Sequence, residues 1–303
     1  MNKNISKIII SILLIFVGLT FLIVFMKLPH YAISHDFKEG KVEYNITWGE
    51  IGKIICNTYK DLLKGSLGTN SKGNSVWQDI RPYFGNTVIL TFFTTIISII
   101  LGFFIGIYEG KKVELRDSTG RVLWKTIFKS LPEPLIIFII YLIILKAFNF
   151  KIIAPGKTTY MSFKDYIVPI LSLLIFPTIH IARITMESII NTYDSQYLIS
   201  AKMKGASNFR ILSNHLIKNI IIDVMEEFSS FIVIIFSNLV IVEYIFYYPG
   251  LTHKLIESYV NSDMNTVFGI AVIIGLISIT YNTVFKVIKN TIDPIKSKSL
   301  QLK

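Results

Sequence analysis

VILTFFTTIISIILGFFIGIY, residues 88–108, is a run of twenty-one residues without a charged side chain. A helix needs about 20 apolar residues, at about 1.5 Å rise per residue, to cross a hydrocarbon core about 30 Å thick. The stretch therefore predicts a membrane-spanning helix. Five more apolar runs predict the same, at 8–26, about 127–148, about 166–184, about 228–246 and about 267–288. The predicted fold class is all-α: a polytopic membrane protein with six transmembrane helices.

The composition favours a membrane protein over a soluble one. Hydrophobic residues make up 52% of the 303-residue chain and charged residues 17%, whereas soluble domains carry about 25% charged residues. The net charge of +11 is better explained by cytoplasmic loops near membrane lipid than by binding to nucleic acid. The single cysteine, Cys56, excludes an intrachain disulfide and a cysteine-based zinc site, and the five histidines show no HExxH spacing.

The positions of Lys and Arg predict the orientation. With the N-terminus inside, the basic segments 109–126 and 185–227 and the tail after 288 all lie in the cytoplasm. The first apolar run is expected to be an uncleaved anchor, because it is longer than the 7–15 residues typical of a signal-peptide core. Both termini are then cytoplasmic.

We therefore expect three regions along the chain: an N-terminal anchor helix at 1–27, an extracellular segment at 28–87, and a core of five spans at 88–303 with a cytoplasmic loop at 190–219. Within the extracellular segment, apolar residues recur at helical spacing from position 48 to position 63. Gly65 is placed to end this amphipathic helix, which we expect on the membrane surface or against the bundle.

A polar and basic stretch interrupts the apolar pattern between the fourth and fifth spans. It reads YLISAKMKGASNFRILSNHLIKN, residues 197–219. Gly205 can end a first short helix, and Ser207 can cap a second helix that continues into the fifth span. Ala201 and Gly205 lie four apart, so they give the first helix a small face on which a partner can pack. The alternative is a basic loop that lies near anionic lipid.

Several short motifs follow one another in a fixed order. They are Gly65-Ser66-Leu67-Gly68, then Asn86-Thr87, then the positions Tyr197, Ala201, Lys204, Gly205, Ser207, Ile211, His215 and Asn219 of the polar stretch, then VEYIFYYPGL at 242–251, and then Asp293-Pro294. In this order and spacing they resemble the permeases of binding-protein-dependent ABC importers, in the branch that carries peptides and nickel. The opening Glu-Ala-Ala of that family's cytoplasmic EAA loop is not kept here.

The resemblance implies a type I ABC importer permease fold, in the plasma (inner) membrane of a bacterium. It also implies that a coupling helix, with Tyr197, Ala201, Lys204, Gly205 and Ser207, contacts an ATPase. The implied partners are a second homologous permease, two cytoplasmic ATPase subunits and an extracellular substrate-binding protein. ATP and Mg would bind to the ATPases, so no cofactor and no catalytic residue is expected in this chain.

The chain's own sequence agrees with an external energy source. A phosphate-binding P-loop needs a glycine five residues before its Gly-Lys-Thr. Gly156-Lys157-Thr158 has Lys151 at that position. The expected cargo is a di- or oligopeptide, with nickel or another metal chelate as the alternative. A rival class, an ATP-independent secondary transporter or channel, is disfavoured because no inverted repeat is evident and the spans carry little central charge.

Two other sets of residues are candidates. Gly102, Gly106 and Gly110 recur every four residues and predict close helix packing, within this subunit or with a second permease. Glu226 and Glu227 open the fifth span, where they either lie at the cytoplasmic interface or face the substrate path. Pro169 and Pro177 predict kinks in the fourth span.

Overall fold

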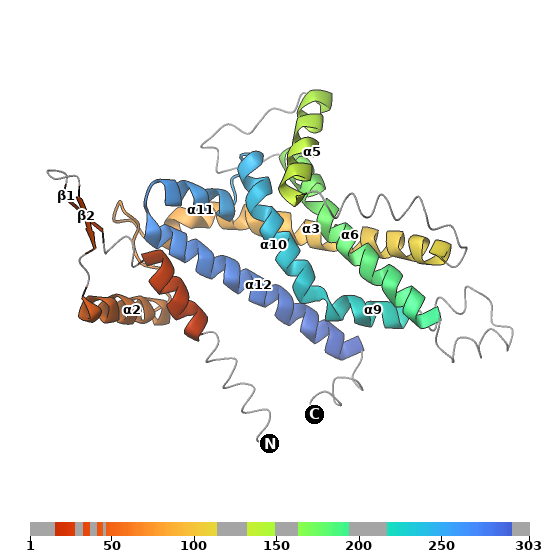
Figure 1. Ribbon diagram of the computed structural model, residues 1–303, viewed down its shortest axis with the longest axis horizontal. Coiled ribbons are helices and arrows are strands. Elements are labelled where there is room, and N and C mark those ends of the chain that lie inside the picture. Colours follow the sequence, from red (N-terminus) through yellow and green to blue (C-terminus); the bar gives the residue numbers. More distant parts are fainter. Residues whose placement is uncertain are drawn as a thin grey trace, which may run out of the picture. The chain divides into compact units, whose positions relative to one another are not determined.

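The computed structural model describes residues 16–27, 33–36, 41–44, 47–113, 132–148, 163–193 and 217–292, and most of them are helical (Figure 1). Four described helices are long and apolar enough to cross a membrane. These are α3 (Val76–Val113), α6 (Phe163–Tyr193), α10 (Phe228–Ile245) and α12 (Met264–Ile292). They contain the predicted second, fourth, fifth and sixth spans, and the all-α class is confirmed.

The first and third predicted spans coincide with shorter apolar helices, Phe16–Lys27 and α5 (Glu133–Phe148). Pro132 marks the start of α5, since its carbonyl accepts the first helical bonds from the Leu135 and Ile136 N–H groups at 3.0 and 3.4 Å. A proline disfavours the helical conformation in the residue before it. Pro132 therefore sets the start of this helix.

The chain forms two compact units. One contains the residues up to Gly85 together with Gly250–Ile277, and the other contains Asn86–Pro249 together with the residues from Ser278. In the first unit, strands β1 (Ile33–Asp36) and β2 (Lys41–Tyr44) pair antiparallel, with Ile33 opposite Tyr44. The sequence analysis did not predict this pair of strands.

Helix α2 (Trp48–Leu63) has the bounds expected from its apolar spacing. At its start, Thr47 and Glu50 form a reciprocal capping box. At its end, Gly65 has a φ of +72°. The Gly65 and Ser66 N–H groups donate to the carbonyls of Leu62 and Asp61 at 3.0 and 2.9 Å. This is a Schellman motif, which needs a left-handed residue at the position of Gly65.

Helix α2 packs against the helix Phe16–Lys27. The Tyr59 ring stacks on Phe16, with 5.0 Å between centroids, and the Tyr59 and Thr20 hydroxyls are 2.8 Å apart. Lys27 Nζ donates to Thr58 Oγ1 at 3.3 Å and lies 4.6 Å from the centre of the Phe268 ring. Helix α2 thus contacts the helix Phe16–Lys27, and its expected place on the membrane surface or against the bundle stays a prediction.

Helix α11 (Leu251–Val260) of the same unit carries a partly buried lysine. Lys254 Nζ lies 3.2 Å from Glu257 Oε2 and 3.8 Å from Asp79 Oδ2. Burial lowers the pKa of Lys254, but Tyr83, Glu257 and Asp79 together raise it further, and the net direction is upward. The lysine therefore keeps its positive charge at neutral pH.

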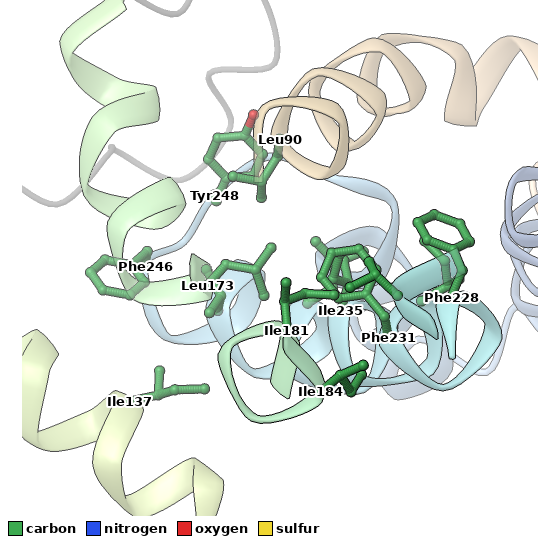
Figure 2. Packing of buried hydrophobic residues seen from close by; sticks show 14 of the residues in the cluster. Leu90, Ile137, Leu173, Ile181, Ile184, Phe228, Phe231, Ile235, Phe246 and Tyr248 are labelled. Carbon is green, nitrogen blue, oxygen red and sulfur yellow. The ribbon is translucent and has the colours of Figure 1, made fainter. Parts of the chain in front are cut away.

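The second unit is built around α6 and α10, and Figure 2 shows how their buried side chains interlock. Leu173, Ile181 and Ile184 of α6 pack with Phe231 and Ile235 of α10. Helix α9 (Ile217–Glu226) adds Ile220 and Val224 to this core. Since large aliphatic and aromatic side chains fill the space between these helices, their relative positions are fixed by shape.

Helix α3 meets α6 in a different way, through three glycines. An added Cβ would lie 2.6 Å from Ile181 Cβ at Gly102, 2.5 Å from Thr185 Cβ at Gly106 and 3.0 Å from Ile189 Cδ1 at Gly110. Real Cβ atoms do not approach other atoms so closely, so only glycine fits at the first two positions. The three glycines therefore pack within this chain, along the half of α6 that ends at Tyr193.

Toward the start of α6 an open apolar groove of about 560 Å³ lies between the two helices. It is lined by side chains of α3 between Ile89 and Leu101 and of α6 between Tyr166 and Leu174. The contact between α3 and α6 is thus tight over one half of α6 and open over the other.

We predict that Gly106→Ala destabilises the protein by about 1–3 kcal/mol, because its Cβ would be forced against Thr185 and the Ala182 carbonyl. Gly85→Ala is the matched control in the same helix, since nothing lies within 4 Å of its added Cβ. It should be neutral or stabilising by up to about 1 kcal/mol. Thermal unfolding of the purified protein in detergent tests both variants, and equal midpoints would refute the close contact.

Candidate functional site

The proposed coupling residues Tyr197, Ala201, Lys204, Gly205 and Ser207 lie outside the described residues. The structure describes what flanks them: α6 ends at Tyr193 and α9 begins at Ile217. The helix expected to run from the polar stretch into the fifth span is interrupted at Glu227, which separates α9 from α10. Helical hydrogen bonds continue on both sides of Glu227, to Asp223 and from Phe231.

Glu226 forms an ion pair with α12. Its Oε1 lies 3.2 Å from Lys289 Nζ, and the two side chains are 40% and 25% exposed. One turn further along α10, Ser229 donates to Asn282 Oδ1 at 2.9 Å. These two contacts join the first turns of α10 to the last part of α12, so Glu226 has a structural partner in this chain.

Glu227 is exposed, and its Oε2 accepts a hydrogen bond from Ser230 Oγ at 3.1 Å. Glu227 is also the N-cap residue of α10, although its side chain makes no bond to the backbone of that helix. An acidic side chain at a helix N-terminus interacts favourably with the positive end of the helix dipole. Glu226 thus lies beside α12, and the glycines Gly102, Gly106 and Gly110 lie on the interface between α3 and α6.

At the opposite end of α10, a fully buried glutamate joins α10 to α3. Thr87 Oγ1 donates to Glu243 Oε1 at 2.7 Å, and both residues are 0% exposed. A buried carboxyl group needs such a donor to offset the loss of water. This contact connects the Asn86-Thr87 motif to the VEYIFYYPGL motif, which are 156 residues apart.

Asn86 extends this connection to the loop after α10. Its Nδ2 donates to the Pro249 carbonyl at 2.8 Å, and its own carbonyl accepts from Tyr248 Oη at 2.9 Å. Its Oδ1 accepts from Tyr166 Oη of α6 at 3.0 Å. Asn86 therefore bonds to groups from α6 and from the loop after α10. The motif residues at this end form a structural network.

A second polar contact inside the bundle was not predicted from the sequence. Asn238, in α10, donates from Nδ2 to Glu133 Oε2 at 2.7 Å, while the same nitrogen bonds to the Ile234 carbonyl at 3.0 Å. Neither residue was singled out from the sequence. Two signals were available: a single amide side chain in the middle of an apolar span, and an acid between two prolines.

The described residues contain no group of three or more His, Cys, Asp or Glu side chains that could hold a metal ion. What they do contain is a bundle of apolar helices, a structural network at one end of α10, an ion pair at its other end, and one glutamate–asparagine pair between them. This arrangement fits an integral membrane protein.

Comparisons with known proteins agree with this description. A family model described as "Binding-protein-dependent transport system inner membrane component" matches residues 98–298. The oligopeptide transport system permease protein OppB of Haemophilus influenzae is 29% identical over 167 residues, which is 55% of this chain and 52% of that protein. The dipeptide transport system permease protein DppB of Alkalihalophilus pseudofirmus is 25% identical over 264 residues, 78% of each chain.

Other relatives match over a shorter stretch. Four Brucella proteins are each 25% identical over 131 residues. The chain therefore spans only 42% of the length of these relatives.

The network around Glu243, at the end of α10, gives a prediction about stability. Thr87→Val keeps the shape of the side chain but removes the donor to Glu243, and the loss of such a buried bond costs about 1–3 kcal/mol. Thr283→Val is the control, because Thr283 is exposed and bonds only to the Ile279 carbonyl. It should change the free energy of unfolding by less than about 0.5 kcal/mol. Denaturation in detergent measures both, and a Thr87→Val protein as stable as the control contradicts the proposed bond.

The ion pair between Glu226 and Lys289, at the other end of α10, gives a second prediction about stability. In a double-mutant cycle, Glu226→Gln and Lys289→Gln should show a coupling energy of about 0.2–1 kcal/mol, since both side chains are partly exposed. The coupling should fall when salt is added, because screening weakens exposed ion pairs. Strictly additive effects at low salt would show that the two residues do not interact.

Proposed function

Because this chain belongs to the family of binding-protein-dependent transport system inner membrane components, we propose that it is the permease subunit of an ATP-driven ABC importer for peptides. The observation that carries the proposal is the family match over residues 98–298. That range begins within α3 and ends beyond α12, so it includes the last part of α3 and all of α5, α6, α9, α10, α11 and α12. The relatives named as oligopeptide and dipeptide permeases support peptides as the cargo.

In this proposal the chain performs no chemistry of its own. Two cytoplasmic ATPase subunits bind ATP and Mg and supply the energy, and a second homologous permease completes the path. An extracellular substrate-binding protein delivers the peptide. The apolar helices and the distribution of Lys and Arg support a location in the inner membrane of a bacterium with both termini in the cytoplasm.

The mechanical link would be the segment between α6 and α9. Tyr197, Ala201, Lys204, Gly205 and Ser207 would form a coupling helix on the ATPase. Its position in the chain supports this role, because it directly joins α6 to α9 and α10, whose side chains share one packed core. A displacement of the segment would therefore act on helices that are fixed to one another by their packing.

We expect Gly205→Arg to abolish peptide uptake while the protein remains in the membrane, because a long charged side chain would disturb the small face that meets the ATPase. Gly120→Arg is the matched control, a glycine in the other predicted cytoplasmic loop, and it should retain uptake. The test is uptake of a labelled tripeptide by cells that carry only the variant gene, with the amount of protein in the membrane measured by immunoblot. Normal uptake by Gly205→Arg at normal abundance would refute the coupling role.

A further inference from the structure

Glu133 lies level with the middle of a membrane-spanning helix. It is the first residue of α5, between Pro132 and Pro134, and it bonds to Asn238 of α10. Asn238 lies about 15 Å from the start of α10 at Phe228 and about 10 Å from its end at Ile245, at about 1.5 Å per residue. The Tyr141 and Phe246 rings, 5.1 Å apart, show that α5 and α10 run in the same direction from this level.

A carboxylate at this depth is unfavourable against lipid, so such residues normally face a water-filled cavity or a partner group. Glu133 is partly exposed, and its carboxylate accepts the hydrogen bond from Asn238. Among the described residues, no Lys, Arg or His nitrogen lies within 4.0 Å of it. The described part of the chain therefore leaves this negative charge without a positive one.

Asn238 adds a second unsatisfied acceptor. It is 1% exposed, and its Oδ1 has no hydrogen-bond partner among the described residues. Its Nδ2 is already used by Glu133 and by the Ile234 carbonyl, which fixes the orientation of the amide. A buried acceptor without a donor is unfavourable. The pair thus presents a carboxylate and an amide oxygen, and lacks a cationic donor.

We propose that Glu133 and Asn238 form a binding site for a protonated amine of the transported peptide. An ammonium group supplies the positive charge and up to three donors, which fit a carboxylate and an amide oxygen. A bare divalent metal ion fits less well, because it needs more ligands than these two and the described residues offer no acidic or histidine cluster. This inference rests on the proposed peptide transport, and the amine is either the N-terminus or a lysine side chain.

The test compares two uptake ratios in cells that carry the wild-type or the variant gene with all native partner subunits. The first ratio is Ala-Lys-Ala to Ala-Gln-Ala, which reports a side-chain amine. The second is trialanine to N-acetyl-trialanine, which reports the N-terminus. Glu133→Gln should lower one of these ratios about tenfold, the effect expected from the loss of one charge-assisted hydrogen bond. Glu133→Asp should restore part of it, and Asn238→Ala should lower the same ratio less strongly.

The controls separate the possible failures. Glu187→Gln removes an exposed carboxylate elsewhere in the bundle, one that pairs with Arg183, and should leave both ratios unchanged. Lys129 precedes Glu133 by four positions in the sequence. If Lys129→Gln and Glu133→Gln reduce the uptake of all peptides equally, the carboxylate serves an ion pair within the chain and the proposal is overturned.

Two further outcomes are decisive. If the wild type imports peptides and Glu133→Gln changes neither uptake ratio, Glu133 and Asn238 do not form a binding site for the amine. If wild-type cells and cells that lack the gene both import none of the four peptides, the proposed peptide transport itself is wrong.

Discussion

The second unit depends on how closely α3 and α6 approach each other. At Gly102 and Gly106 any side chain would overlap with α6, so the two backbones meet there directly. In a membrane the hydrophobic effect does not drive helices together, and close van der Waals contact between small residues takes its place. Ile181 of α6 meets Gly102 of α3 and also belongs to the core in which large side chains of α6, α9 and α10 pack.

Polar side chains in this bundle act in pairs that bring distant parts of the chain together. Thr87 and Glu243 are 156 residues apart, and Glu133 and Asn238 are 105 residues apart. The two pairs differ in one respect. The first is fully buried and surrounded by the contacts of Asn86, Tyr166 and Tyr248, which suits a structural role. The second retains an acceptor, Asn238 Oδ1, that has no donor in the part of the chain that the structure describes, which suits a site that receives a ligand.

The sequence predicted those features whose cause is local. Helix α2 has its expected bounds because a capping box and a glycine define its two ends within a few residues. The long spans were predicted because a run of apolar residues determines them by itself. The pair of Glu133 and Asn238 was not predicted from the sequence. The spans were expected to carry few charged residues at their centres. Glu133 and Asn238 belong to separate helices, and only the packing of α5 on α10 shows that the Glu133 carboxylate lies level with the middle of a span.

The two halves of α6 differ in how closely they contact α3, and this difference affects where the helix can bend. Pro169 and Pro177 lie inside the helix and before the residues that contact the α3 glycines. Each proline leaves the carbonyl four residues earlier without its helical partner, which lowers the energy needed to bend there. The empty volume between α3 and α6 adjoins the same half. Any bending of α6 would therefore be concentrated at its two prolines, ahead of the part that the α3 glycines hold in place.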